Sequence, residues 1–195
     1  VVSQLHREFI RAGTDIVQAF TYYGHREKLR LIGKEDLLEP LQKNALQIAK
    51  DARDEFKDLD LLVCGDVANT NIYNPDDKKS HIECQKMYEE QVGWAKEAGV
   101  DFIVAETINW TGEMKIALKA IKDAGMIAVT NFSIKKGDKT REGHTPGDAC
   151  KIMEDLGADV VGLNCYRGPA MTMKLLPEIR KKVSCHVAAL PVPYR

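Results

Sequence analysis

The sequence predicts an α/β protein in which parallel strands alternate with helices and form a barrel-like sheet. Short apolar runs, such as 101–106 and 159–163, alternate with longer segments whose apolar residues recur at helical spacing. A glycine stands shortly before each of four apolar runs, where it suits the end of a helix because it adopts left-handed conformations at little cost. The runs are apolar at successive positions, as in strands that are covered on both faces. This order of elements is typical of parallel α/β folds.

Six strands are expected from the apolar runs, over residues 15–20, 60–66, 101–106, 126–132, 159–165 and 184–190. A (β/α)8 or TIM barrel uses roughly 250 residues. The 195 residues therefore predict an incomplete TIM barrel with about six of eight βα units, lacking the first and last strands. An open doubly wound sheet is the alternative, although no Gly-x-Gly-x-x-Gly follows any expected strand.

The helices between these strands have recognisable ends and buried stripes. Residues 1–8 have the pattern of a helix already under way, and Leu38 opens an apolar stripe that continues to residue 52. The run Ser80-His81-Ile82-Glu83 matches a capping box and predicts a helix that begins there. Thr145 precedes Pro146, which is the arrangement of a cap residue and a first-turn proline.

The composition gives no sign of a nucleic-acid-binding, membrane or disulfide-rich protein. The formal net charge of -1 gives no reason to expect a nucleic acid or an anionic membrane as partner. No apolar stretch approaches the roughly 18 residues of a transmembrane helix, and no signal peptide is recognisable. The five cysteines, an odd number at wide spacing, disfavour a disulfide scaffold. We therefore expect reduced thiols and a cytoplasmic location.

Cys165 is the leading candidate for chemistry. It follows Gly162-Leu163-Asn164 at the end of an expected strand, and in (β/α) barrels chemistry gathers at the carboxyl ends of strands. A thiol there could be a zinc ligand, a catalytic nucleophile or a buried core residue. The nucleophile reading needs a partner base, and neither His144 nor His186 has an evident geometric link to it.

Other strand ends carry further candidates. Glu106 closes an apolar strand, so it is expected either to pair with a neighbouring strand or to contact a substrate. The aromatic residues of 20–24 could form a cage for an onium group, or could simply pack the strand end. Asp66, the segment 69–71 and the pair Thr130-Asn131 follow or close other strands at the same face, although such residues are also common in turns.

Several of these motifs resemble one enzyme family in order along nearly the whole chain. Residues 4–13 and 18–23 (Gln-Ala-Phe-Thr-Tyr-Tyr in the second) look like the early barrel of betaine–homocysteine S-methyltransferases. Residues 101–106 and 162–165 are similar to two further motifs of the wider homocysteine S-methyltransferase family. The Gly-x-Asn-Cys strand end is the most specific of these matches. On this resemblance, residues 1–195 are expected to be a single homocysteine S-methyltransferase-like barrel domain, truncated at both ends.

The resemblance implies a zinc-dependent methyltransferase. It implies transfer of a methyl group from betaine or a related onium donor to the homocysteine thiolate, giving methionine, with homocysteine and the donor as partners and a homo-oligomer as one possible assembly. Cys165 matches the first of three zinc thiolates, and the other two are expected outside this chain. Glu106 matches the residue that holds the homocysteine amino group, and Tyr23 matches a tyrosine of the betaine pocket. Thr21 and Asn164 lie within the same motifs and are expected to contact substrate.

Three parts of the family pattern are absent from this sequence. There is no Gly-Gly-Cys-Cys run to supply the other zinc ligands and no Asp-Gly-Gly strand, and Thr107 stands where betaine enzymes have a tyrosine. These absences motivate an alternative function, a non-catalytic barrel that binds a small ligand or a partner without a complete zinc site.

Overall fold

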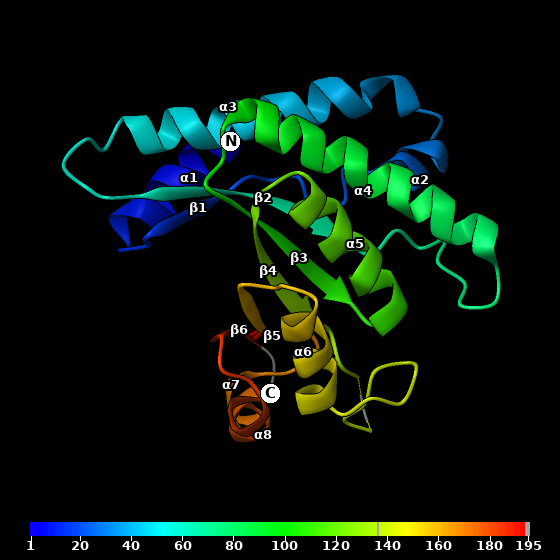
Figure 1. Ribbon diagram of the computed structural model, residues 1–195. Coiled ribbons are helices and arrows are strands. Elements are labelled where there is room, and N and C mark those ends of the chain that lie inside the picture. Colours follow the sequence, from blue (N-terminus) through cyan, green and yellow to red (C-terminus); the bar gives the residue numbers. More distant parts are fainter. Residues whose placement is uncertain (136, 194–195) are drawn as a thin grey trace.

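The computed structural model describes residues 1–135 and 137–193 and contains one parallel sheet (Figure 1). The sheet has six strands in the sequential order β1-β2-β3-β4-β5-β6, and every neighbouring pair is parallel. The strands are β1 Ile16–Gln18, β2 Leu62–Ala68, β3 Phe102–Ile108, β4 Ile127–Phe132, β5 Val160–Asn164 and β6 His186–Leu190. Sequential order in a curled parallel sheet is the arrangement of a TIM barrel, so the predicted partial barrel is confirmed.

Helices connect the strands and wrap the outer side of the curled sheet (Figure 1). They are α1 Val2–Arg11, α2 Arg26–Arg30, the 3-10 helix η1 Glu35–Leu37, α3 Leu38–Asp54, α4 Lys78–Ala98, α5 Thr111–Asp123, α6 Pro146–Asp155, α7 Pro169–Met173 and α8 Leu176–Lys182. No helix of the described residues is both long and apolar enough to cross a membrane.

The sheet separates two apolar layers of very different size. The large layer joins the sheet to the helices and includes Val63, Ile103 and the fully buried Tyr88 of α4. A small inner cluster on the opposite face consists of Cys64, Phe102, Val104 and Val129, with Val160 packed against it. Side chains alternate between the faces of a strand, so the inner-face residues that follow this cluster toward the carboxyl ends are polar in β2 to β5, where they are Asp66, Glu106, Asn131 and Asn164. In β6 the corresponding residue is the apolar Leu190.

One of the two helix starts predicted from capping residues is confirmed, and the other is corrected. Thr145 accepts a hydrogen bond from Asp148 N at 3.3 Å, so the predicted cap is confirmed. The predicted start at Ser80 was wrong, because α4 begins at Lys78 and Asp77 is its cap. Asp77 Oδ1 accepts from Lys79 N at 2.9 Å, whereas the Ser80 hydroxyl donates to the Asp77 carbonyl at 2.8 Å. Asp77, three residues before Ser80, therefore caps the first turn of α4 by accepting from the backbone amide of Lys79.

Gly162 allows β5 and β6 to approach each other closely. A Cβ atom at this position would lie 1.9 Å from the Ala188 carbonyl oxygen and 2.8 Å from Asn131 Oδ1. β5 ends at Asn164, one residue before the predicted end, and Cys165 follows with a φ of 58°. The glycine of the Gly-x-Asn-Cys motif is therefore a packing requirement, while its asparagine and cysteine lie where the strand opens.

Candidate functional site

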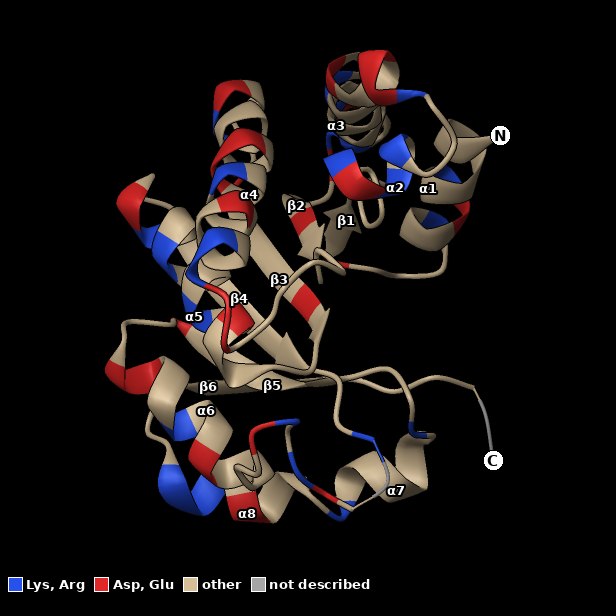
Figure 2. Cartoon of the chain, turned by 90° about the vertical axis from the view of Figure 1, so that its right-hand side faces the viewer, with Lys and Arg blue, Asp and Glu red and all other residues tan. Residues whose placement is uncertain are grey.

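Polar side chains from four strands meet on the inner face of the sheet and form what we call the polar cluster: Gln18, Asp66, Glu106 and Asn164. Gln18 Nε2 donates to Asp66 Oδ2 at 2.8 Å and to Glu106 Oε1 at 3.2 Å. Asn164 Nδ2 donates to Glu106 Oε2 at 3.0 Å. The two acidic residues lie toward the carboxyl ends of β2 and β3, where red bands interrupt these strands in Figure 2. Glu106 is therefore held by an amide group at each of its oxygens.

The backbone is irregular at two of the four strand ends that carry the cluster, those of β3 and β5. The register of β3 against β4 shifts between Glu106 and Ile108, and the intervening Thr107 has a φ of 57°. Cys165 and Tyr166 also have positive φ, at 58° and 54°. Bulges and left-handed non-glycine residues concentrate at functional sites, where they redirect side chains at the cost of local strain. Three of the five left-handed non-glycine residues among the described residues thus lie at the ends of β3 and β5, and the other two are Asn71 and Asp138.

Burial perturbs both carboxyl groups of the polar cluster. It raises the pKa of Asp66 well above its usual range, and the charge of nearby Glu106 raises it further. The pKa of Glu106 is also raised by burial, although the hydrogen bonds with Gln18, Asp66 and Asn164 oppose this. Two neighbouring carboxyl groups with raised pKa values favour a state in which one of them keeps its proton. Perturbed acids of this kind in a cleft mark candidate functional sites.

Asp66 and Glu106 line a cavity of about 590 Å³, called the inner cavity here. Its wall also includes Gln18 and Tyr22, and Leu190 of β6 lies across from them. Apolar side chains of α1, among them Phe9, cover another side. The volume falls in the range of small-molecule sites, which combine apolar walls with a few polar groups.

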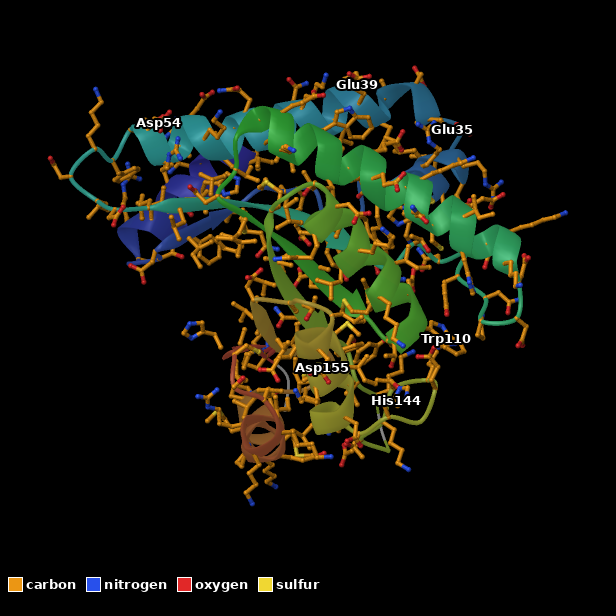
Figure 3. The ribbon with its side chains drawn as sticks, in the orientation of Figure 1. Glu35, Glu39, Asp54, Trp110, His144 and Asp155 are labelled. Atoms are coloured by element: carbon orange, nitrogen blue, oxygen red, sulfur yellow. The ribbon has the colours of Figure 1, made fainter. Side chains whose placement is uncertain are left out.

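A second cavity of about 320 Å³, called the aromatic pocket, lies at the ends of the strands. Its lining includes the aromatic residues Tyr23, Tyr73, Trp110 and Tyr166, together with Thr107, Lys135 and Arg141. The Lys135 ammonium lies 4.9 Å from the centre of the Tyr166 ring, and the Arg141 guanidinium lies 5.4 Å from the Trp110 ring. Figure 3 shows Trp110 and His144 at the same end of the molecule, and His144 Nδ1 lies 2.9 Å from Thr111 Oγ1. The imidazole of His144 is thus bound to the residue that follows Trp110, which lies in the wall of this pocket.

The predicted site residues divide between these features. Glu106 and Asn164 meet in the polar cluster, whereas Tyr23 lies in the aromatic pocket with 42% of its side chain exposed. Thr21 is buried, and its hydroxyl donates to the Asp66 carbonyl at 2.8 Å, so it fixes the position of β2. Cys165 is a half-buried free thiol just past the end of β5.

Comparison with known proteins identifies the family of this chain. The model of the homocysteine S-methyltransferase family matches residues 1–193. The chain belongs to this family. Betaine–homocysteine S-methyltransferase 1 of Xenopus tropicalis is 32% identical over 203 residues, an alignment that covers 99% of this chain and 49% of the relative. The Mus musculus protein of the same name is 33% identical over 185 residues, covering 91% of this chain and 44% of the relative.

The chain spans about half the length of the curated relatives it matches. The metallated form of the homocysteine methyltransferase MmuM from Escherichia coli has the same fold, with a TM-score of 0.82 at 18% identity. That superposition covers 96% of this chain and 70% of the other. The partial barrel is therefore the fold of a homocysteine S-methyltransferase family member, as the sequence motifs predicted.

The described residues do not form a zinc site by themselves. No group of three or more His, Cys, Asp or Glu side chains within residues 1–135 and 137–193 is placed to hold a metal. Burial raises the pKa of Cys64, which lies in the small inner cluster. It also raises the pKa of Cys150, to about 12, so thiolate formation is opposed at both residues. Cys185 directly precedes β6 and so lies at the opposite end of the sheet from Cys165. Cys84 of α4 is buried in the helix-side core, where its Sγ lies 3.1 Å from Thr70 Oγ1 beyond the end of β2, and burial raises its pKa to about 11. Cys165 is thus the one described cysteine that directly follows the carboxyl end of a strand.

Sequence reasoning missed several contributors to the site, among them Gln18, Tyr166, Lys135 and Arg141. Gln18 bridges the two carboxyl groups, and Tyr166 forms a wall of the aromatic pocket. A signal for Gln18 was present, because it is a polar residue inside an otherwise apolar strand. For Tyr166 the sequence shows only an aromatic residue after Cys165, with nothing to indicate the positive φ that turns it over the strand end.

Proposed function

We propose that this protein transfers a methyl group from betaine or a related onium donor to the thiolate of homocysteine, giving methionine. The observation that carries the proposal is Glu106, a half-buried carboxylate held by two amides beside the inner cavity of a homocysteine S-methyltransferase barrel. Such a carboxylate suits the ammonium group of an amino acid, because buried charge needs a hydrogen-bonded partner of opposite sign.

Homocysteine is proposed to bind with its ammonium group against Glu106. Asn164 holds Glu106 Oε2, and Gln18 holds Oε1, so the carboxylate does not have to be reoriented when the ligand arrives. Preorganised contacts of this kind place the sulfur of the substrate at a defined distance from the cluster. The role of Glu106 and Asn164 is therefore binding and orientation, and no proton transfer is assigned to them.

The methyl donor is proposed to occupy the aromatic pocket. The rings of Tyr23 and Tyr166 already attract protein cations, Lys28 Nζ at 4.4 Å and Lys135 Nζ at 4.9 Å from the ring centres, and an onium group that displaced them would be attracted in the same way. Lys135 and Arg141 supply positive charge for a carboxylate on the same donor. Thr107 lines this pocket, while its neighbour Glu106 lines the inner cavity, so the two ligands would meet at β3. In the reaction the thiolate sulfur forms a bond to the methyl carbon as the methyl–nitrogen bond breaks, and the nitrogen keeps the electron pair.

Cys165 is proposed as one thiolate ligand of a zinc ion, as the family implies. The half-buried position of Cys165 beside the strand ends supports this assignment, and a zinc ion there would favour the ionised form of the substrate thiol. The described residues supply one such thiolate, so the remaining ligands would have to come from other residues. The single barrel domain and the cytoplasmic location stay predictions.

A non-catalytic barrel is the second candidate, and the incomplete ligand set within the described residues favours it. A direct assay separates the two functions. The protein is incubated with homocysteine and betaine carrying an isotopic label in its methyl groups, and labelled methionine is measured. Where the remaining zinc ligands are supplied, we expect transfer that stops in Glu106→Gln but persists in the exposed control Glu83→Gln. Binding of homocysteine without any transfer, from betaine, sulfonium donors or S-methylmethionine, would favour the non-catalytic barrel.

A further inference from the structure

The carboxyl group of Asp66 is a buried acid that the proposed methyl transfer does not yet use. Its side chain is 4% exposed, and only Oδ2 has a hydrogen-bond partner, the amide of Gln18. Oδ1 is buried with no partner among the described residues. A buried carboxyl oxygen without a hydrogen bond is costly and is therefore uncommon in native proteins. While both acids are ionised, the described residues offer no donor to this oxygen. When Asp66 keeps its proton it can share it with Glu106, and a ligand that carries N–H donors would take over that role.

The unpartnered oxygen belongs to a side chain that faces a cavity. Asp66 and Glu106 both line the inner cavity, and the same Gln18 amide nitrogen contacts a carboxyl oxygen of each. The two acids therefore lie on either side of one nitrogen, close enough to share a ligand. A molecule that approaches Glu106 through the cavity passes within reach of Asp66.

The charge around this pair favours a positively charged ligand. No lysine or arginine lines the inner cavity among the described residues. The one basic side chain there is His6, whose pKa is lowered by burial, so it is neutral near neutral pH. The other titratable groups near the pair, Tyr22 and Cys64, are neutral or negative. Burial of two acids without a protein cation leaves a site that a ligand cation would neutralise.

We propose that Asp66 is a second acceptor for the α-ammonium group of the amino-acid substrate, and that Asp66 and Glu106 together select a primary ammonium. A primary ammonium has three N–H donors, which can serve Glu106 and the free oxygen of Asp66 at once. A quaternary onium group has none and would leave Asp66 Oδ1 unpartnered. A divalent metal requires more ligands than two carboxylates, and the described residues hold no group of three. This inference rests on the proposed function, because it assigns the ligand of the same site.

The test compares homocysteine with 4-mercaptobutanoate, which keeps the thiol and the carboxylate but lacks the amino group. Dissociation constants are measured by calorimetry for the whole protein, for Asp66→Asn and for the control Asp101→Asn. Asp101 precedes β3 at the opposite end of the sheet, where its carboxylate accepts from Val63 N. We expect the unaltered protein and Asp101→Asn to prefer homocysteine. Asp66→Asn is expected to bind homocysteine about 10-fold more weakly, with the affinity for 4-mercaptobutanoate unchanged.

Each outcome is decisive. If Asp66→Asn keeps the preference for homocysteine, or weakens both ligands equally with normal circular dichroism, Asp66 is structural and the inference is wrong. The inference also fails if the unaltered protein shows no preference for the ligand that carries an amino group. The methyl-transfer assay keeps the two ideas apart. Selective binding without methyl transfer would overturn the proposed function and leave the role of Asp66 standing.

Discussion

The Asn164 side chain binds both hydrogen-bonding groups of Thr107 that face it. Its Oδ1 accepts from Thr107 N at 2.9 Å, and its Nδ2 donates to Thr107 Oγ1 at 2.6 Å as well as to Glu106. One amide thus stabilises the left-handed backbone of Thr107 and at the same time fixes the carboxylate beside it. The end of β5 therefore controls the shape of the end of β3, across the intervening strand β4.

Asn164→Ala is expected to damage binding of homocysteine more than catalysis. The substitution removes one of the two amide partners of Glu106 and both hydrogen bonds between residue 164 and Thr107, so the carboxylate is held by Gln18 alone. We expect KM for homocysteine to rise about 10-fold, equivalent to the loss of roughly 1.4 kcal/mol of binding, with a smaller change in kcat. Steady-state kinetics with saturating donor measure this, and Asn44→Ala on the exposed face of α3 is the control. A fall in kcat at unchanged KM would contradict the assigned role.

Gly162→Ala is expected to destabilise the fold by about 2–3 kcal/mol, because its Cβ atom would collide with the backbone of β6. The matched control is Gly93→Ala in the middle of α4, where a Cβ meets nothing within 4 Å. There we expect a gain of about 0.5–1 kcal/mol from the better helix propensity of alanine. Urea unfolding followed by circular dichroism gives both free energies. Equal changes in the free energy of unfolding for the two substitutions would show that β5 and β6 can move apart without loss of stability.

Much of the fold could be predicted because local patterns determine it. Each of the six expected strands is present, and Gly13, Gly99, Gly125 and Gly157 all have positive φ at the ends of helices. The start of α4 was misplaced because two capping residues, Asp77 and Ser80, compete within one turn. Sequence spacing alone does not decide such a competition, which depends on the backbone conformation before the helix.

Less of the site could be predicted, because it depends on contacts between distant strands. Glu106 and Asn164 were expected at the site, yet nothing in the sequence indicated that they touch each other. Thr107 was treated as a missing tyrosine, whereas its left-handed conformation and its bonds to Asn164 are a feature of the chain in their own right. The pairing of Asp66 with Gln18 also arises only when β1 and β2 align in register.

Asp66 is expected to make the stability of the protein fall as pH rises. Its pKa is raised in the folded state without ligand, so it keeps its proton to higher pH there than in the unfolded chain, which ionises near pH 3.9, roughly the ordinary value for aspartate. Its contribution is therefore complete below that pH and is lost as pH rises through the folded-state pKa. We expect Asp66→Asn to raise the urea midpoint at pH 8 and to flatten its decline between pH 5 and pH 8. An Asp66→Asn profile parallel to that of the unaltered protein would show that this acid is ionised in the fold.

Glu113 is expected to be a structural acid that fixes the loop after β2. It is 2% exposed, and its Oε1 accepts from Thr70 N at 2.7 Å, from Thr70 Oγ1 at 2.6 Å and from the Tyr88 hydroxyl at 3.2 Å. Glu113→Ala leaves these donors buried without a partner and should cost about 2–4 kcal/mol. Glu113→Gln keeps an acceptor oxygen and should cost less. Thermal unfolding measures both, and a loss in Glu113→Gln as large as in Glu113→Ala would show that the charge, not the acceptor, matters.

Residues 1–195 alone are expected to hold zinc weakly. A structural zinc site uses four protein ligands, and a catalytic site uses three, whereas the described residues place one thiol, that of Cys165, at the strand ends. A single thiolate cannot exclude water from the metal or compete with common chelators. After dialysis against a mild chelator, we expect much less than one zinc per chain by elemental analysis, with the small residue reduced in Cys165→Ser and unchanged in Cys185→Ser. One tightly held zinc per chain would mean that other side chains move to Cys165 when the metal binds, and the described arrangement of ligands would then have to be revised.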